Sequence, residues 1–274
     1  MSHAYIVSPL RTPIGKFGGS LASLPAAQLA AAVMRAVLER AALPAELIDE
    51  VIVAQGYSSS EAPCMGRYAA SLVGLPDSVA GYSVDRRCGS GLQAVIDAAM
   101  QIQTGVADCL LVAGVESMSN IEYYSTSMRW GSRLGDVTMH DRLDRGRVNS
   151  QPISVYGECK GGAVETAENL VRDYGISRED CDRWAVGSHH KAAAAWREGR
   201  FDKEVLPIEV PQRKGAPLIF SRDEGFREDA SYEAMAKLPA ILSDGTVTAG
   251  SASQQNDAAA GCLVVSERFL KEHN

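Results

Sequence analysis

Two kinds of hydrophobic pattern alternate along residues 1–119. Short apolar runs are typical of strands buried between helices, and stretches with apolar residues every three or four positions are typical of amphipathic helices. The apolar runs fall at residues 5–10, 50–55, 80–84 and 108–114, and the helical pattern falls at residues 26–42, 65–73 and 92–102. This alternation predicts an α/β fold with one mainly parallel sheet and helices on both faces. Pro9 is expected to end the first strand.

The pattern changes beyond residue 119 and returns near residue 249. Residues 123–150 are polar and lack sustained periodicity, and helices are predicted at 165–174 and 178–197, the second with Ser177 as its N-cap. Three prolines at 207, 211 and 217 predict short edge strands or loops. An apolar run at 262–265 is expected to rejoin the first sheet. We therefore predict an α/β domain of residues 1–119 completed by 249–274, and an inserted irregular α+β loop domain of residues 120–248.

Composition and charge exclude several classes of protein. A chain of 274 residues with 46% hydrophobic residues can bury a substantial core. Its sequence contains no apolar run of membrane-spanning length and does not begin with a basic segment followed by an apolar one, so we expect a cytoplasmic protein with no membrane partner. The formal net charge of −7 argues against nucleic acid as a partner.

The six cysteines are scattered, at positions 64, 88, 109, 159, 181 and 262. There is no C-x-x-C pair and no His/Cys cluster at metal-ligand spacing, so the sequence predicts free thiols in a reducing compartment and no metal site. Five of these thiols are expected to be inert, because free cysteines usually act as small hydrophobic residues. Only Cys88 lies in a sequence context typical of a reactive thiol.

Cys88 lies between a predicted strand and a predicted helix. It is followed by Gly89, Ser90 and Gly91, and the helical pattern begins at Leu92. Unpaired backbone N–H groups and the positive end of the helix dipole favour a thiolate at such a position. The small residues beside it leave the sulfur approachable by a bulky substrate. The sequence therefore predicts that Cys88 is a nucleophile.

Six segments resemble motifs of the thiolase superfamily and occur in that family's order. They are Cys88-Gly89-Ser90-Gly91, Gly114-Val115-Glu116-Ser117-Met118-Ser119, Thr166-Ala167-Glu168-Asn169, Arg213-Lys214-Gly215, Asp223-Glu224 with Arg227, and Gly245-Thr246-Val247-Thr248-Ala249-Gly250. The resemblance implies an acyltransferase of the acetyl-CoA acetyltransferase or 3-ketoacyl-CoA thiolase type. It also implies an N-terminal α/β half, a loop domain and a C-terminal α/β half, of which we find only the first two.

The resemblance also implies a reaction. Cys88 would take the acyl group from an acyl-CoA, and the enzyme would form or cleave a 3-ketoacyl-CoA through this acyl-thioester intermediate. Acyl-CoA and CoA are substrates, and no separate cofactor is implied. Matching positions place Arg213 near a CoA phosphate and Ser253 near the pantetheine. The backbone N–H of Cys88 resembles one donor of the family's oxyanion hole.

The family's base and its oligomeric state are further expectations. In thiolases a histidine and a second cysteine, both in glycine-rich motifs of the C-terminal half, move protons. Neither of these motifs is found in this sequence. This chain alone is therefore expected not to complete a turnover. Family members are dimers or tetramers, and the 65–73 helix with Arg67 matches a contact region, so we expect a homo-oligomer.

Three alternative functions remain open. Gly89-x-Gly91-x-x-Ala94 fits a relaxed dinucleotide fingerprint, although residues 85–87 separate it from the strand and Cys88 would then have no role. A decarboxylating ketoacyl synthase shares the fold and the cysteine, but the insertion with Arg213 favours a thiolase. The third alternative is a non-catalytic thiolase-like subunit. The sequence does not fix the direction of the reaction or the acyl chain length.

Overall fold

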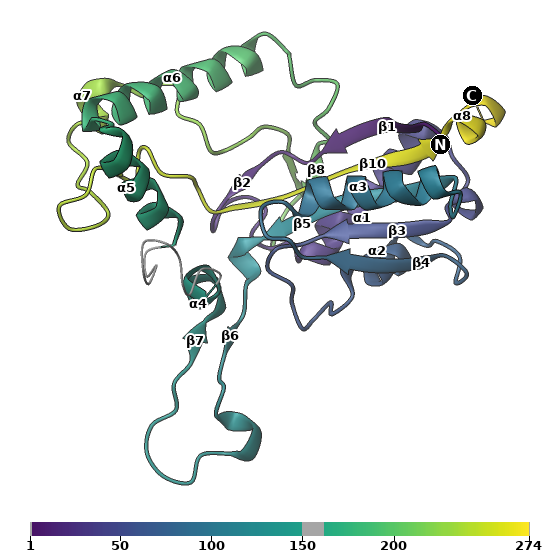
Figure 1. Ribbon diagram of the computed structural model, residues 1–274, viewed down its shortest axis with the longest axis horizontal. Helices are drawn as coiled ribbons and strands as arrows, with labels where there is room; N and C mark the ends of the chain where they lie inside the picture. The colour runs from purple at the N-terminus through teal and green to yellow at the C-terminus, as the bar shows by residue number, and fades with distance from the viewer. Residues whose placement is uncertain (1, 150–161, 274) are drawn as a thin grey trace. The chain divides into compact units, whose positions relative to one another are not determined.

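The computed structural model describes residues 2–149 and 162–273 and divides the chain into two compact units (Figure 1). Unit 1 comprises Met1–Asn120, Asp202–Glu224 and Gln255–Asn274, and unit 2 comprises Ile121–Phe201 and Gly225–Gln254. The domain boundaries predicted from the sequence stay a prediction. The compact units differ from them mainly in residues 202–224, which pack with unit 1 although the sequence pattern assigns them to the insertion.

Unit 1 contains the main sheet and its covering helices. Its elements are β1 (Ala4–Arg11), β2 (Gly15–Lys16), α1 (Ala26–Ala41), β3 (Glu50–Ala54), α2 (Met65–Val73), β4 (Ala80–Val84), α3 (Ser90–Thr104), β5 (Cys109–Ser117), β8 (Ile208–Val210), β9 (Leu218–Phe220), β10 (Asn256–Ser266) and α8 (Glu267–Glu272), with short 3-10 turns at Ala45–Leu47 and Met118–Asn120. The predicted strands and helices of the first 119 residues are all present, within a few residues at their ends.

The sheet is mixed in direction. Its strand order is β1-β10-β5-β3-β4, with β2 paired to β10. Strand β3 runs parallel to β4 and β5, whereas β10 runs antiparallel to β1 and β5. The last strand therefore rejoins the first sheet as predicted, and it does so in the middle, between β1 and β5.

Alternate residues of each central strand pack on opposite faces of the sheet. On β3, Val51 and Val53 belong to the core formed with α1 and α2, and Ile52 and Ala54 belong to the core formed with α3. Both sets are buried because the sheet is covered on both faces, as Figure 1 shows.

Helix α3 covers the sheet with small residues. Its buried face carries Ala94, Ala98 and Ile102. Leu92, Ile96 and Met100 lie on its other face, with exposed fractions of 69%, 41% and 49%. Helix α3 therefore has apolar residues on two faces, and only one of these faces is covered in unit 1.

Strand β1 does not end at Pro9 as expected. It continues to Arg11, and its pairing with β10 shifts between Val7 and Leu10. Ser8 has a positive φ of 51° in this bulge. Proline is tolerated here because β1 is an edge strand and the bulge interrupts the ladder at this point.

Residues 202–224 are held to unit 1 by charge and by burial. The Arg11 guanidinium pairs with Glu204 at 2.7 Å and with Asp223 at 2.8 Å. Strands β8 and β9 form an antiparallel pair whose Ile208, Val210 and Phe220 are buried in the core with α1 and α2. These long-range contacts leave no trace in the local pattern, and for that reason the pattern assigns the segment to the insertion.

Unit 2 is largely helical among the residues that the structure describes. Its elements are β6 (Tyr123–Tyr124), a 3-10 turn (Met128–Trp130), β7 (His140–Asp141), α4 (Arg142–Asn149), α5 (Ala163–Tyr174), α6 (Arg178–Arg197) and α7 (Tyr232–Met235). Ser177 caps α6 as predicted, because its hydroxyl accepts a hydrogen bond from the backbone N–H of Asp180 at 3.0 Å.

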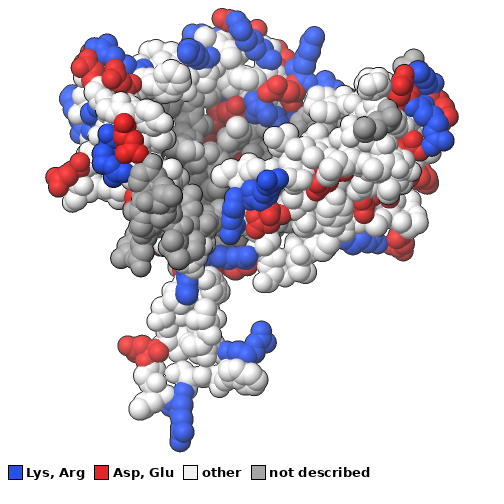
Figure 2. Space-filling view, in the orientation of Figure 1, with Lys and Arg blue, Asp and Glu red and all other residues white. Residues whose placement is uncertain are grey.

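Charged side chains are interspersed on the face drawn in Figure 2, where Lys and Arg lie among Asp and Glu. The segment with β6 and β7 is mostly uncharged in this view. Trp130 and Leu134 of this segment are almost fully exposed. Large apolar side chains that gather in solvent are typical of association surfaces.

Candidate active site

Cys88 lies where the sequence predicts it, two residues before α3. It is exposed, and Gly89 is the N-cap of the helix. A Cβ added at Gly91 would meet no atom within 4 Å, so the space beside this turn is open. The thiol therefore stands at the positive end of a helix with room for a substrate beside it.

Ser90 closes the turn from inside the protein. Its buried hydroxyl accepts a hydrogen bond from the Arg86 N–H at 2.7 Å and donates one to the Arg87 carbonyl oxygen at 2.6 Å. The Gly89 N–H also donates to the Arg86 carbonyl at 3.1 Å. These bonds fix the backbone on both sides of Cys88.

Arg87, immediately before Cys88, has a left-handed backbone with a φ of 51°. Its N–H donates to Asp85 Oδ1 at 3.0 Å, and its guanidinium donates to the carbonyl oxygen of Gly56. The guanidinium also lies 5.5 Å from the centre of the Tyr57 ring. A non-glycine residue keeps such a conformation only where its surroundings hold it.

Glu116 holds the Gly56–Tyr57 segment. Its Oε2 accepts a hydrogen bond from the Gly56 N–H at 2.9 Å, and its Oε1 accepts one from the Tyr57 N–H at 3.2 Å. Burial raises the pKa of the Glu116 carboxyl, and the two backbone N–H groups oppose that rise because they stabilise the carboxylate. The sequence does not predict this contact, although Glu116 lies near the end of a predicted strand and within one of the six segments that resemble family motifs.

A pocket of about 340 Å³ opens at the carboxyl ends of β3 and β5, beside the Cys88 turn. Its lining includes Gln55, Gly56, Arg87, Ser90, Gly114 and Glu116. This is the edge of the sheet where ligands bind in open α/β folds. The turn that carries Cys88 therefore forms one wall of a small hollow.

Three of the other described cysteines are disfavoured as nucleophiles, because the pKa of each thiol is raised. Burial raises the pKa of Cys109 to about 12 and that of Cys262 to about 11, so both remain protonated near neutral pH. Burial also raises the pKa of Cys181. Cys64, partly buried, contacts the Gly81 carbonyl oxygen at 3.4 Å. Cys159 lies outside the described residues.

Among the described residues of unit 1, the two histidines, His3 and His273, have no hydrogen bond to Cys88, and the other three histidines are in unit 2. The ring of His189 accepts a hydrogen bond from the Arg227 N–H at 3.1 Å, and the ring of His190 contacts the Ala230 carbonyl oxygen at 2.8 Å. Burial, above all, lowers the pKa of His189. These two rings therefore have structural partners within unit 2.

The two residues expected to contact CoA are exposed and lie on different loops. Arg213 is in the loop between β8 and β9 of unit 1, and Ser253 is at the end of the 225–254 segment of unit 2. Neither residue belongs to the Cys88 turn. Their assignment as CoA contacts stays a prediction.

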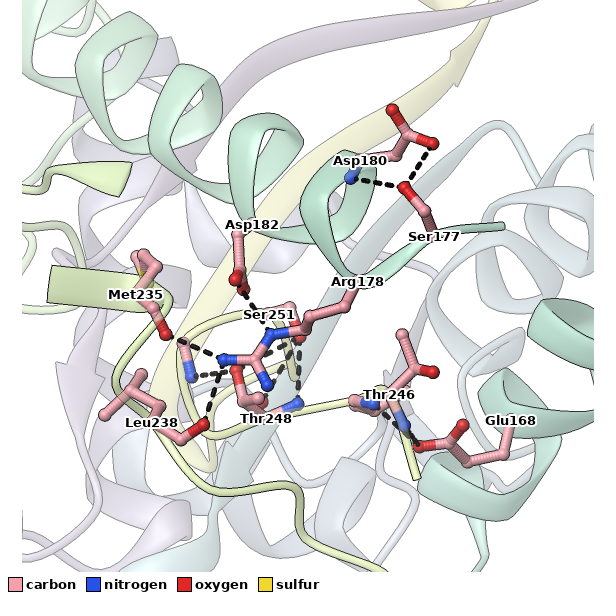
Figure 3. Close-up of polar contacts among 12 residues, drawn as sticks. Glu168, Ser177, Arg178, Asp180, Asp182, Met235, Leu238, Thr246, Thr248 and Ser251 are labelled. Carbon is pink, nitrogen blue, oxygen red and sulfur yellow. Dashed lines mark hydrogen bonds and ion pairs between the residues drawn. The ribbon is translucent and has the colours of Figure 1, made fainter. Parts of the chain in front are cut away.

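The loop that leads to Ser253 is fixed within unit 2 (Figure 3). Glu168 Oε1 accepts hydrogen bonds from the N–H groups of Thr246 at 2.8 Å and Val247 at 2.7 Å. A Cβ added at Gly245 would lie 2.6 Å from the same oxygen, so a side chain there would displace the carboxylate from its two N–H donors. The Thr248 N–H then donates to Ser251 Oγ at 3.0 Å, which closes the next turn. The family resemblance includes both segments but does not predict the bond between them.

The described residues contain neither a cluster of metal ligands nor a membrane-spanning helix. No group of three or more His, Cys, Asp or Glu residues is placed to hold a metal ion. No helix among them is long and apolar enough to cross a membrane.

Comparisons with known proteins agree on one family. Residues 4–268 match the family model of the thiolase N-terminal domain. The chain is 40% identical over 275 residues to a probable acetyl-CoA acyltransferase of Staphylococcus aureus strain N315, covering all of this chain and 68% of that protein. It is 42% identical over 273 residues to an acetyl-CoA acetyltransferase of Cupriavidus necator, covering 99% of this chain and 68% of that protein.

Solved structures give the same result for the fold. An acetyl-CoA acetyltransferase of Bacillus anthracis superposes with a TM-score of 0.92 at 37% identity, and human mitochondrial 3-ketoacyl-CoA thiolase superposes with a TM-score of 0.91 at 33% identity. Each match covers all of this chain and 68% of the other chain.

Proposed function

The chain belongs to the thiolase family of acyltransferases, and we propose that it forms or cleaves 3-ketoacyl-CoA through an acyl group carried on Cys88. The family assignment confirms the resemblance and the thiolase-like α/β fold predicted from the motifs. One observation supports the role of Cys88 above all: among the described cysteines it is the exposed one, and it lies at the start of α3.

The proposed first half-reaction is transfer of the acyl group to sulfur. The Cys88 thiolate attacks the carbonyl carbon of acyl-CoA, a new carbon–sulfur bond forms, and the bond to the CoA sulfur breaks. CoA leaves as a thiol after taking up a proton. In the second half-reaction the acyl group joins the α-carbon of a second acyl-CoA, which loses a proton, and the Cys88 thiolate is regenerated. The Cys88 N–H is proposed as one donor to the oxyanion.

We propose that a C-terminal α/β half completes the site. It would supply the base that the five histidines of this chain do not offer Cys88, so this chain alone would not turn over. The exposed apolar face of α3, with Leu92, Ile96 and Met100, is the surface proposed to receive it. A helix that is apolar on two faces is typically buried between two layers, and the similar proteins extend over a greater length than this chain.

Acyl-CoA and CoA are the proposed substrates, with no separate cofactor. Arg213 is proposed to pair with a phosphate, because its guanidinium is exposed on a loop and carries paired donors. Ser253 is proposed to contact the pantetheine, at the end of the loop that Glu168 fixes. The acyl chain length and the favoured direction are left open.

We also propose a homo-oligomer, a dimer or a tetramer, that works in the cytoplasm. In unit 1, β4 ends the strand order of the sheet, and Tyr68 and Leu72 of the neighbouring α2 are exposed. In unit 2, Trp130 and Leu134 support self-association. The five described cysteines are free thiols, which is typical of a reducing compartment.

Mapping of the acyl group tests this function directly. The complete protein, meaning this chain together with the proposed C-terminal half, is incubated with acetyl-CoA in the absence of any dinucleotide. The reaction is quenched with acid, and the protein is digested and examined by mass spectrometry. An acetyl group is expected on the peptide that contains Cys88, because the acyl-cysteine is a true intermediate. An unmodified Cys88 peptide, or an acetyl group confined to another cysteine, would contradict the proposal.

The α3 surface gives a second prediction. Leu92→Glu is expected to change the free energy of unfolding of the 274-residue chain by no more than about 0.5 kcal/mol, because Leu92 is exposed there. In the complete protein the same change should lower it by about 2 kcal/mol or more, because the leucine would be buried. Urea denaturation of both lengths makes the comparison, and equal effects would argue against docking on α3.

A further inference from the structure

The proposed reaction leaves the partly buried carboxylate of Glu116 without a role. We propose that Glu116 is a positioning residue, which holds the turn of Cys88 through the Gly56–Tyr57 segment and Arg87. This inference rests on the proposed function, in which Cys88 is acylated. It adds a residue that never touches the acyl group but sets where the sulfur stands.

The first link joins Glu116 to the segment that leaves β3. The Gln55 N–H still bonds to the Val84 carbonyl at 3.0 Å, as the last bond between β3 and β4. The next two N–H groups, of Gly56 and Tyr57, donate to Glu116. A Cβ added at Gly56 would lie 3.2 Å from Glu116 Oε2, so the carboxylate and this backbone are closely packed.

The second link joins this segment to Arg87. With its N–H fixed by Glu116, the Gly56 residue presents its carbonyl oxygen to the Arg87 guanidinium. The Tyr57 ring lies under the same guanidinium, with 5.5 Å between its centre and the Arg87 Cζ. The long side chain of Arg87 is thereby anchored at its far end.

The third link is the backbone of Arg87 itself. A left-handed conformation at a non-glycine residue is unfavourable and persists only where other contacts hold it. Arg87 adjoins Cys88, so its relaxation to an ordinary conformation would redirect both the sulfur and the N–H of Cys88. Ser90 restrains the helix side of the turn, and the Glu116 chain of contacts restrains the strand side.

The charges near Glu116 agree with this role. Arg87 favours the carboxylate, whereas burial and Asp85 disfavour it, and the two backbone N–H groups satisfy its oxygens. Asp85 in turn lies 3.6 Å from the Arg87 guanidinium, so the group contains two acids and one shared cation. Loss of the Glu116 side chain would leave two backbone N–H groups without their acceptors.

Three variants of the complete protein test the inference: Glu116→Ala, Glu116→Gln and, as a matched control, Glu224→Ala. Glu224 also accepts backbone N–H groups, from Lys16 and Ser20, but in a different loop. The rate constant of Cys88 acetylation and the acetyl-CoA concentration for half-saturation are measured by quenched flow. Glu116→Ala should lower the rate constant about 10- to 100-fold with the half-saturating concentration unchanged, because misplacement affects the reaction and not binding.

The conservative variant separates positioning from charge. Glu116→Gln should stay within about threefold of the parent rate, because Oε2 alone lies within 2.9 Å of the Gly56 N and 3.3 Å of the Tyr57 N, and an amide oxygen at that position still accepts from both N–H groups. Glu224→Ala should keep the parent rate even where its melting temperature falls. A folded Glu116→Ala protein that is acetylated at the parent rate would overturn the inference alone. A parent protein that is not acetylated on Cys88 would overturn the proposed function as well.

Arg87→Met keeps the test decisive if Glu116→Ala does not fold. This change breaks the same chain of contacts at its half-exposed end and should lower the acetylation rate about tenfold. Arg86→Met is its matched control, because it removes an equal charge beside Cys88 but breaks only the side-chain bond to Gln93. Equal losses in the two variants would show that charge alone matters and would overturn the Glu116 inference.

Discussion

Cys88→Ala is expected to lower the exchange of acetyl groups between acetyl-CoA and labelled CoA by about 10⁴-fold or more in the complete protein. Alanine has no atom that can carry the acyl group, so the route through a covalent intermediate is lost. The substitution should not disturb the packing or the turn, because Cys88 is exposed and its turn is held by Ser90 and Arg87. The fold should therefore be retained, and the loss would report chemistry.

Two further variants make this result specific. Cys88→Ser puts a hydroxyl in place of the thiol and should also lose most of the exchange, because a hydroxyl is far less ionised than a thiol near neutral pH and is the weaker nucleophile. Cys64→Ala is the matched thiol control, since Cys64 precedes α2 and bonds to the Gly81 carbonyl away from the helix that Cys88 begins. Persistent exchange in Cys88→Ala, or its loss in Cys64→Ala, would contradict the assignment of the nucleophile.

The parts of the site that depend on local sequence are predictable. The strand at Ala80–Val84, the glycine-rich turn and the helix after it follow from residue types within a short window, so the pattern alone locates Cys88 at a helix start. The same holds for the Ser177 cap of α6. Turns and caps are set by neighbours in the chain, and those neighbours can be identified from the sequence.

The parts that depend on long-range contact are not predictable in this way. Glu116 meets Gly56 across 60 positions, and no spacing rule connects a strand end to a loop so far away. The left-handed conformation of Arg87 is unexpected, because that conformation usually marks glycine and here is imposed by the surrounding bonds. The periodicity of α3 predicts that its large apolar residues face the sheet. In the structure its small residues cover the sheet, and Leu92 and Ile96 stay exposed on a second apolar face. Periodicity alone does not show which of two apolar faces is covered.

Arg178→Met is expected to destabilise unit 2 by about 3 kcal/mol. Arg178 pairs with Asp182 at 2.8 Å and donates to the carbonyl oxygens of Met235 and Leu238 (Figure 3). The Asp182 side chain is only 1% exposed, so removal of its partner leaves a buried charge uncompensated. The expected loss is at the low end for buried pairs, because the Arg178 side chain is 31% exposed. Hydrogen exchange should rise in residues 178–197 and 232–238 before it rises in β3 and β5 of unit 1.

The double variant Arg178→Met with Asp182→Leu separates the buried charge from the lost hydrogen bonds. Apolar replacement of both partners removes the uncompensated carboxylate and should recover most of the stability. A deficit of about 1–2 kcal/mol should remain, because the Met235 and Leu238 carbonyl oxygens still lack their donor. Parent-like exchange in Arg178→Met would show that this pair does not hold unit 2 together. A double variant no more stable than Arg178→Met would assign the whole loss to the contacts with the Met235 and Leu238 carbonyl oxygens.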